Sequence, residues 1–322
     1  MASTKSYPQH MSLGANTRGF FHLIRYPNLI FILLTQTLFY FFIIVPVSVG
    51  SPKLTLEDFI LLAMASISIA AAGYIINDYF DMDIDFVNKP ERMVIGKNVS
   101  RRWAMLLHML LSLVGLFFTA IVSMHLGSLW LLFLNFLSVF LLLLYSTTFK
   151  KRFIVGNVII SLLTSWVIIS LFVAELKWSD PEYMKLHYPE LSTIYKYTLV
   201  YAAFAFIVSL IREVVKDLED QVGDRKYGCT TMPIKWGDAM TKNFIYIWIF
   251  LLIAFLISLS VYAFIKQWHW ITAIFAIIIF FQVIRIAMNI KKANNVSDYA
   301  MISLQLKYLM LTGILSMISF RL

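Results

Sequence analysis

The sequence has little charge and almost no cysteine. Of its 322 residues, only 14% are charged whereas 60% are hydrophobic. A soluble domain carries more charge than this, so we expect the apolar excess to face lipid. Cys229 is the single cysteine, which excludes an intrachain disulfide. Residues 1–19 are polar and contain no apolar signal-peptide core, so we expect no secretory leader.

Motifs of several enzyme classes are also missing. The sequence contains no P-loop, no serine-hydrolase elbow and no CxxC pair. Its six histidines show no paired metal-ligand spacing, which argues against a haem or zinc centre. The net charge of +9 could indicate a nucleic-acid partner. However, the lysines and arginines fall in short segments between apolar runs, which is the usual pattern of membrane topology, so we expect no nucleic-acid partner.

What the sequence has instead is nine apolar runs, most of them near the ~20 residues that cross a bilayer core. They span residues 28–48, 59–76, 104–124, 128–146, 153–174, 197–211, 243–265, 267–284 and 299–320. Eight contain no Asp, Glu, Lys or Arg, and the last contains only Lys307. This pattern predicts an all-α fold, a multi-pass membrane bundle of nine transmembrane helices.

The basic residues indicate how the bundle is oriented. Most of the 27 lysines and arginines lie in the segments on the same side of the runs as the N-terminus, and this bias predicts that side to be cytoplasmic. We therefore expect a cytoplasmic N-terminal segment at residues 1–27 and a single transmembrane domain at 28–322, in the cell (inner) membrane. Asp-rich loops at 77–103 and 212–242 are expected on the cytoplasmic face.

Two acidic motifs with the same D-x-x-D-x-x-x-D spacing follow the second and the sixth apolar runs. They comprise Asp78, Asp81, Asp85, Asp217, Asp220 and Asp224. On a continuing helix, residues at i, i+3 and i+7 share one face, so each motif sets three carboxylates side by side. Like charges in that arrangement repel each other and need a cation, and their oxygen ligands suit Mg²⁺. Two such motifs four helices apart indicate a parallel internal repeat and predict a metal-assisted clamp for a diphosphate.

Other polar residues near the motifs are candidates for the same site. Asn77 could orient a carboxylate or contact a phosphate, whereas Asp83 faces the other way on a helix. Positive charge beyond the metal ions would stabilise a departing diphosphate, and Arg offers two parallel hydrogen bonds to phosphate. The candidates are Arg92, Lys150, Arg152, Lys216 and Arg225. Membrane topology alone is the competing explanation for them, because cytoplasmic loops are rich in Lys and Arg.

With these motifs the chain resembles the UbiA superfamily of intramembrane prenyltransferases. The resemblance rests on N-D-Y-F-D-x-x-x-D at 77–85 with Asn88, Pro90 and Arg92 after it, on Tyr145-Ser146 with Lys150 and Arg152, on Gly156-Asn157, and on K-D-L-E-D-Q-V-G-D at 216–224. It implies helices around a central cavity that opens laterally to lipid for a polyprenyl tail. The six motif aspartates would bind Mg²⁺–diphosphate, which Arg92, Lys150 and Arg152 would neutralise. Tyr145 is a candidate to stabilise the allylic cation that forms when diphosphate leaves.

The second motif also indicates an acceptor. Its extended form, R-E-x-x-K-D-L-E-D-x-x-G-D followed by Thr231 and Pro233, is most similar to the digeranylgeranylglyceryl phosphate synthases. That resemblance implies transfer of a geranylgeranyl group to geranylgeranylglycerol phosphate, which forms an ether lipid. From Arg92 onwards the chain departs from the common pattern, with R-M-V-I-G-K in place of an R-P-I-P-S-G type segment.

Two alternatives stay open at this stage. Within the enzyme class, the acceptor could be an aromatic acid such as 4-hydroxybenzoate, a homogentisate or a naphthoate. Outside it, the chain could be a membrane transporter or a lipid-binding protein. An acceptor phosphate should require extra cations near the cavity, for which Arg101 and Arg102 are candidates. An aromatic acid should need only one or two cations. The expected partners are a polyprenyl diphosphate, a lipid or aromatic acceptor and membrane lipid, with no obligate protein partner.

Overall fold

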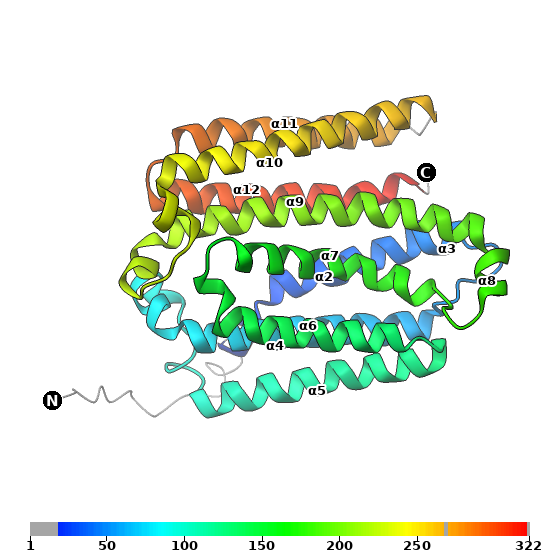
Figure 1. The fold of residues 1–322 in the computed structure, drawn as a ribbon, viewed down its shortest axis with the longest axis horizontal. Helices are drawn as coiled ribbons and strands as arrows, with labels where there is room; N and C mark the ends of the chain where they lie inside the picture. The colour runs from blue at the N-terminus through cyan, green and yellow to red at the C-terminus, as the bar shows by residue number, and fades with distance from the viewer. Residues whose placement is uncertain (1–18, 267–269, 321–322) are drawn as a thin grey trace.

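The structure is a computed structural model that describes residues 19–266 and 270–320, and most of these residues are helical (Figure 1). The long helices are α2 (Tyr26–Phe39), α4 (Leu56–Asn88), α5 (Arg101–Leu126), α6 (Leu129–Thr147), α7 (Val155–Glu175), α9 (Tyr188–Lys226), α10 (Met232–Ile265), α11 (Trp270–Lys292) and α12 (Val296–Leu315). A π turn, η1 (Tyr40–Ile44), and the short α3 (Val45–Val47) continue α2, and η4 (Ser316–Phe320) continues α12. The shorter elements are η2 (Pro90–Arg92), η3 (Phe149–Lys151) and α8 (Pro181–Leu186).

Nine helices in the described part of the chain are long and apolar enough to cross a membrane. Each contains one of the predicted apolar runs or most of it, so the predicted all-α, nine-helix membrane bundle is confirmed. Residues 1–18 of the predicted N-terminal segment 1–27 lie outside the described residues, as do residues 267–269 and 321–322.

Helix boundaries follow local capping signals in the sequence. Thr55 accepts a hydrogen bond from the Asp58 amide at the start of α4, and Ser100 accepts one from the Trp103 amide at the start of α5. Asn295 and Asp298 form a capping box at the start of α12. Gly127 ends α5 in the left-handed conformation that L-residues with a side chain rarely adopt. These caps satisfy backbone groups that the ends of helices leave open.

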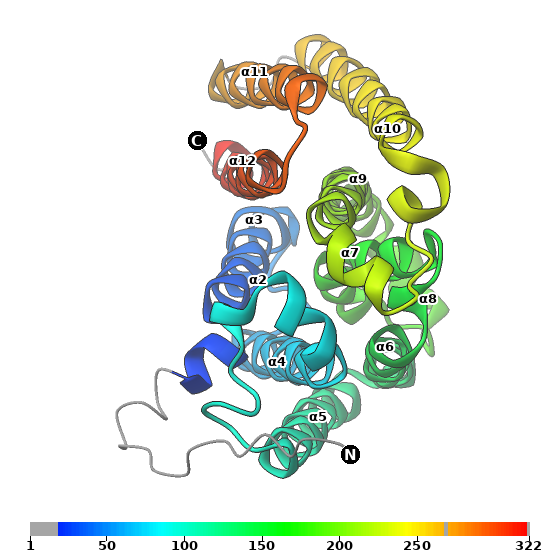
Figure 2. The same cartoon turned by 90° about the vertical axis from the view of Figure 1, so that its left-hand side faces the viewer.

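The helices α4 and α9 occupy the interior of the bundle. Figure 2 looks along the helices and shows α4 next to α5 and α6, and α9 beside α7, with α10 and α11 beyond it. These two are also the most buried of the nine spans. One core cluster fills the space between α9, α10, α11 and α12, and another joins α2, η1, α4, α7 and α9. The two helices that carry the acidic motifs are therefore held by packing on most sides.

Both acidic motifs lie in the last turns of unusually long helices. The 33 residues of α4 and the 39 of α9 correspond to about 50 and 58 Å of helix, against roughly 30 Å for a bilayer core. The segments 77–103 and 212–242, expected as Asp-rich loops, are therefore largely helical. Residues 89–100 separate α4 from α5, and residues 227–231 separate α9 from α10, which has a kink at Gly237 near its start. These connections are short because α4 and α9 continue past the apolar runs that mark the lipid-facing part.

The predicted sixth helix also begins earlier than its apolar run. It starts at Tyr188, nine residues before the run at 197–211, so the segment between α7 and α9 contains only the short α8 and its flanks. In Figure 1 the C-terminal ends of α4 and α9 lie at the same end of the bundle. This parallel placement of two motif-bearing helices agrees with the predicted parallel repeat.

Candidate functional site

The first acidic motif is held by basic side chains from outside α4. Asp78 accepts a hydrogen bond from Arg25 at 2.6 Å. Asp81 is buried, with 2% of its surface exposed, and forms an ion pair with Lys150. Asp85 is half-buried and within electrostatic reach of Lys150 and Asp81. The predicted common face of these three carboxylates is confirmed, and Asp83 is exposed as the helical period requires.

The second motif has its own set of partners. Asp217 accepts a hydrogen bond from the Asn157 amide of α7 at 2.8 Å. Asp220 lies 2.7 Å from the Lys89 ammonium, which also contacts Glu219 at 3.0 Å. Asp224 is buried and accepts a 3.4 Å hydrogen bond from the Thr231 hydroxyl. Each carboxylate is thus positioned by a residue from another segment, so the arrangement depends on tertiary contacts.

The two motifs meet through Asn88, the last residue of α4. Its amide donates to the Asp220 carbonyl at 2.9 Å and its side-chain oxygen accepts from the Gly223 N–H at 2.7 Å. A Cβ on Gly223 would lie 2.6 Å from this amide, so only glycine permits the approach. Asp224 is within electrostatic reach of Lys150 and of Asp81 in the first motif. The carboxylates of both motifs therefore border one polar region.

Neighbouring carboxylates raise the pKa values of three basic residues near the helix ends. Asp78 raises the pKa of Arg25 above its ordinary value. Burial lowers the pKa of Lys150, but the adjacent Asp81, together with Tyr145 and Asp85, raises it more, so the net pKa lies well above the usual value. Lys89 behaves in the same way, with burial opposed by Asp220. All three side chains therefore stay charged at neutral pH.

The backbone that carries one of these cations is strained. Among the described non-glycine residues, only Arg25 and Ile154 have a positive φ, at 51° and 54°. Arg25 itself contacts Asp78, whereas Ile154 is the N-cap residue of α7, just after the turn η3 that carries Lys150. A left-handed conformation at such residues costs roughly 1–3 kcal/mol and is typical of functional sites.

Not all of the cations that the sequence predicted for the diphosphate lie beside the carboxylates of the two motifs. Lys150 lies among the carboxylates, but Lys216 donates to Glu213 instead, at 3.2 and 3.3 Å. Arg152 and Arg225 are exposed, and the Arg152 guanidinium lies over the Phe149 ring. The side chain of Arg92 lies outside the described residues.

The remaining candidates are placed as follows. Tyr145 is half-buried and within electrostatic reach of Lys150. Asn77 is buried near the first motif. Arg101 and Arg102 are exposed in the first turn of α5.

Sequence reasoning missed Arg25 and Lys89. Both were attributed to membrane topology, because they are basic residues in segments between apolar runs. Nothing in their local sequence separates them from other basic residues in such segments. Asn88 and Asn157 belonged to the motifs of the resemblance, yet no contact could be assigned to them. Gly223 gave the one local signal of such a contact, because a glycine inside a helical pattern indicates that another group approaches the helix backbone closely.

The residues of this region fit a hard divalent cation. The donor set is entirely carboxylate and amide oxygen, which Mg²⁺ prefers. The side-chain oxygen of Asn77 is buried without a hydrogen-bond partner among the described residues, so it is available as a ligand or a phosphate neighbour. Within residues 19–266 and 270–320, no three carboxylates converge on one point. Asp78 and Asp81 are meanwhile paired with Arg25 and Lys150.

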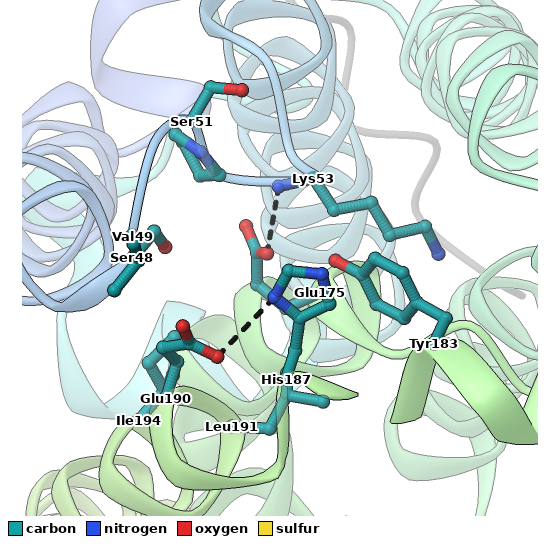
Figure 3. A pocket seen from close by; sticks show the side chains of 11 residues that line it. Ser48, Val49, Ser51, Lys53, Glu175, Tyr183, His187, Glu190, Leu191 and Ile194 are labelled. Atoms are coloured by element: carbon teal, nitrogen blue, oxygen red, sulfur yellow. Dashed lines mark hydrogen bonds and ion pairs between the residues drawn. The ribbon is translucent and has the colours of Figure 1, made fainter. Parts of the chain in front are cut away.

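Two hollows lie away from the motifs. A small polar pocket at the opposite end of the bundle is shown in Figure 3. There Glu175 accepts the backbone N–H groups of Lys53 and Leu54, both at 3.0 Å, and ties the α3–α4 connection to α7. An apolar cavity of about 440 Å³ lies between α9, α10, α11 and α12. Neither is lined by a described residue of the two motifs.

Comparison with known proteins identifies the family. Residues 29–310 match the model of the UbiA prenyltransferase family, so the chain belongs to that family and the predicted superfamily is confirmed. The chain is 32% identical over 209 residues to a digeranylgeranylglyceryl phosphate synthase of Methanothermobacter thermautotrophicus, covering 63% of this chain and 64% of that protein. It is 30% identical over 247 residues to one of Methanobrevibacter smithii, covering 74% and 81%. The match thus spans somewhat less than two thirds of the first relative.

Solved structures share the fold. A structure of digeranylgeranylglyceryl phosphate synthase has a TM-score of 0.65 at 23% identity, over 95% of this chain and 99% of the other. A UbiA homologue from Archaeoglobus fulgidus, bound to GPP and Mg²⁺, has a TM-score of 0.58 at 14% identity, over 94% and 99%. At these identities the comparison establishes the fold, and the protein is a multi-pass integral membrane protein of that fold.

Proposed function

We propose that the protein transfers a geranylgeranyl group from its diphosphate to geranylgeranylglycerol phosphate, in a reaction that depends on Mg²⁺. The proposal rests chiefly on one observation, the approach of two carboxylate motifs at the ends of α4 and α9 through Asn88 and Gly223. Carboxylates alone would repel a diphosphate. Their combination with the half-buried cations Arg25 and Lys150 is what a site for a metal-bound diphosphate requires.

The acceptor is inferred from relatives and from the form of the second motif. The two relatives described above are digeranylgeranylglyceryl phosphate synthases, and the extended second motif has the form typical of that group. The A. fulgidus homologue binds GPP with Mg²⁺, which supports a prenyl diphosphate donor and a divalent metal. We place the motif end of the bundle on the cytoplasmic side of the cell (inner) membrane, because most of the basic residues lie there.

The reaction joins two substrates and releases diphosphate. The C1–O bond of the donor breaks, and its electron pair leaves with the diphosphate. The free hydroxyl oxygen of the glycerol phosphate bonds to C1, gives its proton to the departing diphosphate and becomes an ether oxygen. Mg²⁺, when bound, supplies positive charge that stabilises the departing diphosphate. The residues proposed to hold it are Asp78, Asp81, Asp85, Asp217, Asp220 and Asp224.

The chain's own residues supply the rest of the chemistry. Lys150 and Arg25 carry positive charge to the edge of the site, where they balance the charge that develops on the leaving group. Asn157 and Asn88 orient the second motif by hydrogen bonds at 2.8 and 2.9 Å. Tyr145 faces this region from α6, and we assign it the allylic cation. Arg92, Arg152, Lys216 and Arg225 stay predictions for the diphosphate.

The direct test measures transfer of radiolabelled geranylgeranyl diphosphate by the purified protein. Geranylgeranylglycerol phosphate and 4-hydroxybenzoate are offered separately, each with Mg²⁺ and with EDTA. We expect a Mg²⁺-dependent ether product from the first acceptor alone. Product only from the aromatic acid would move the acceptor to the aromatic class. Transfer that persists in EDTA would contradict the metal assignment.

A further inference from the structure

A second group of charged side chains lies on α9 just before the acidic motif. Arg212 is the first charged residue after the apolar run 197–211, and Glu213 and Lys216 follow it. Glu213 is buried, and it accepts hydrogen bonds from Arg212 at 3.0 Å and from Lys216 at 3.2 and 3.3 Å. We refer to Arg212, Glu213 and Lys216 as the α9 cation pocket. Arg212 lies about 7.5 Å along the helix from Asp217, toward the membrane interior, and Lys216 directly precedes Asp217.

The hydrogen-bonding capacity of Arg212 is largely unused. Its side chain is 15% exposed, and its Nε is buried without a hydrogen-bond partner among the described residues. Its one described ion pair is with its own neighbour, Glu213. A guanidinium has five N–H donors, and leaving a buried donor unsatisfied is costly. A charged residue inside a membrane helix is expected to face a functional cavity.

Lys216 has two carboxylates near it, whereas the one described ion pair of Arg212 is with Glu213. Arg212 and Lys216 carry two positive charges, and the negative charges beside them are those of Glu213 and of Asp217, which lies within electrostatic reach of Lys216. Lys216 also lies within electrostatic reach of Arg25 and Lys150. Those two cations have their own partners, Asp78 and Asp81, in the first motif. The cation of this group that keeps an unpartnered, buried N–H among the described residues is therefore Arg212.

We propose that the α9 cation pocket binds the phosphate of the acceptor, which moves Lys216 from its predicted place at the donor diphosphate to the acceptor. This inference rests on the proposed function and names the group on the acceptor that is recognised. The phosphate of a glycerol phosphate lies two carbons from the reacting hydroxyl, so it must bind a few ångströms from the site of bond formation. The pocket directly precedes the second motif on α9, with Lys216 next to Asp217, whereas Arg101 and Arg102 lie exposed at the start of α5. Glu213 orients both cations, and the Arg212 guanidinium can hold two phosphate oxygens at once.

The kinetic test compares Arg212→Gln with Arg285→Gln. Arg285 is exposed on α11, so its replacement removes the same charge without touching the pocket. We expect Arg212→Gln to raise the KM for geranylgeranylglycerol phosphate roughly 10- to 100-fold, the size of a lost charge-assisted hydrogen bond. The KM for geranylgeranyl diphosphate should change less than about threefold. A rise in the donor KM instead would assign Arg212 to the diphosphate and overturn the inference.

Binding without turnover gives an independent measurement. The wild type is heated in detergent with geranylgeranylglycerol phosphate or with geranylgeranylglycerol, which lacks the phosphate, and no donor is added. We expect the phosphate-bearing lipid to raise Tm more than its phosphate-free analogue. Arg212→Gln should abolish this difference, Arg285→Gln should keep it, and Arg212→Lys should keep part of it. Equal stabilisation by both lipids in the wild type, or an unchanged difference in Arg212→Gln, would overturn the inference.

The two experiments separate the inference from the proposed function. If no acceptor is prenylated but the phosphate-dependent rise in Tm requires Arg212, the pocket stands and the proposed reaction does not. If the ether forms and neither measurement responds to Arg212, the reaction stands and the pocket is wrong. Should Arg212→Gln fail to fold, Arg212→Lys keeps the charge and still tests the pocket, because Lys cannot reproduce two parallel hydrogen bonds.

Discussion

Asn88 and Gly223 are 135 residues apart in the chain, yet the side chain of one is hydrogen-bonded to the backbone of the other at 2.7 Å. The contact joins the last residue of α4 to the turn of α9 that lies between Asp220 and Asp224. Asn88 also donates to the Asp220 carbonyl. Asn88 and Gly223, together with the adjacent pair of Lys89 with Asp220, therefore hold the two acidic motifs at a fixed spacing.

This relationship predicts a specific double-mutant cycle. Asn88→Ala removes two hydrogen bonds, and Gly223→Ala places a Cβ where the Asn88 amide lies, so both changes break the same contact. Each should lower kcat/KM for transfer roughly 10- to 30-fold, which corresponds to about 2 kcal/mol. The double variant should be no worse than either single one. Effects that multiply would contradict the shared contact.

A matched control for this cycle is Asn289→Ala. Asn289 donates to Gln305 at 2.9 Å between α11 and α12, in the part of the bundle without acidic motifs. The substitution Asn289→Ala removes a side-chain amide that, like that of Asn88, joins two helices. We expect transfer activity to stay within about twofold of the wild type. A loss as large as that of Asn88→Ala would mean that general loosening of the bundle explains both.

The helical face of the first motif predicts unequal effects of two similar changes. Asp81 is buried against Lys150, whereas Asp83 is exposed. Asp81→Asn removes a charge from the site and should lower the transfer rate by roughly 100-fold or more. Asp83→Asn removes the same charge from the surface and should change the rate by less than about twofold. Steady-state rates at saturating Mg²⁺ decide this, and equal losses would refute the assignment of faces.

The pair between Lys150 and Asp81 predicts an effect on stability. Lys150→Met leaves a buried carboxylate without its counter-ion, which should lower the free energy of unfolding by about 3 kcal/mol. Adding Asp81→Asn removes that uncompensated charge, so the double variant should regain much of the loss. Thermal unfolding in detergent measures both. If the double variant is less stable than Lys150→Met, the pair contributes packing rather than charge balance.

The single cysteine predicts a pH-dependent reactivity. Burial, with Asp224 nearby, raises the pKa of Cys229 to about 11. The thiolate is the reactive form, so the rate of alkylation by a maleimide should rise with pH up to about that value. At pH 8 it should be roughly 100-fold slower than for a free cysteine. Protein unfolded in SDS is the control and should react at the ordinary rate. Rapid labelling of the folded protein at pH 8 would contradict the buried thiol.

Local patterns in the sequence were enough to predict the helices and the faces of the motifs. Uncharged runs such as 59–76 must lie in lipid or in a core, and an α-helix satisfies its own backbone there. The period of the helix then places Asp78, Asp81 and Asp85 together and Asp83 apart, as the structure confirms. The ends of α4 and α9 were not predictable from hydropathy, because polar turns continue a helix without adding apolar residues.

The partners of the carboxylates were decided only by the tertiary structure. Arg25 meets Asp78 across 53 residues of chain, and Lys150 meets Asp81 across 69. In the sequence each is one basic residue among many between apolar runs, and membrane topology explains them all equally well. A helical period states which face a side chain occupies. Which cation faces it depends on how α2, α4, α7 and α9 pack, and that packing is set by the shapes of buried side chains far from the motifs.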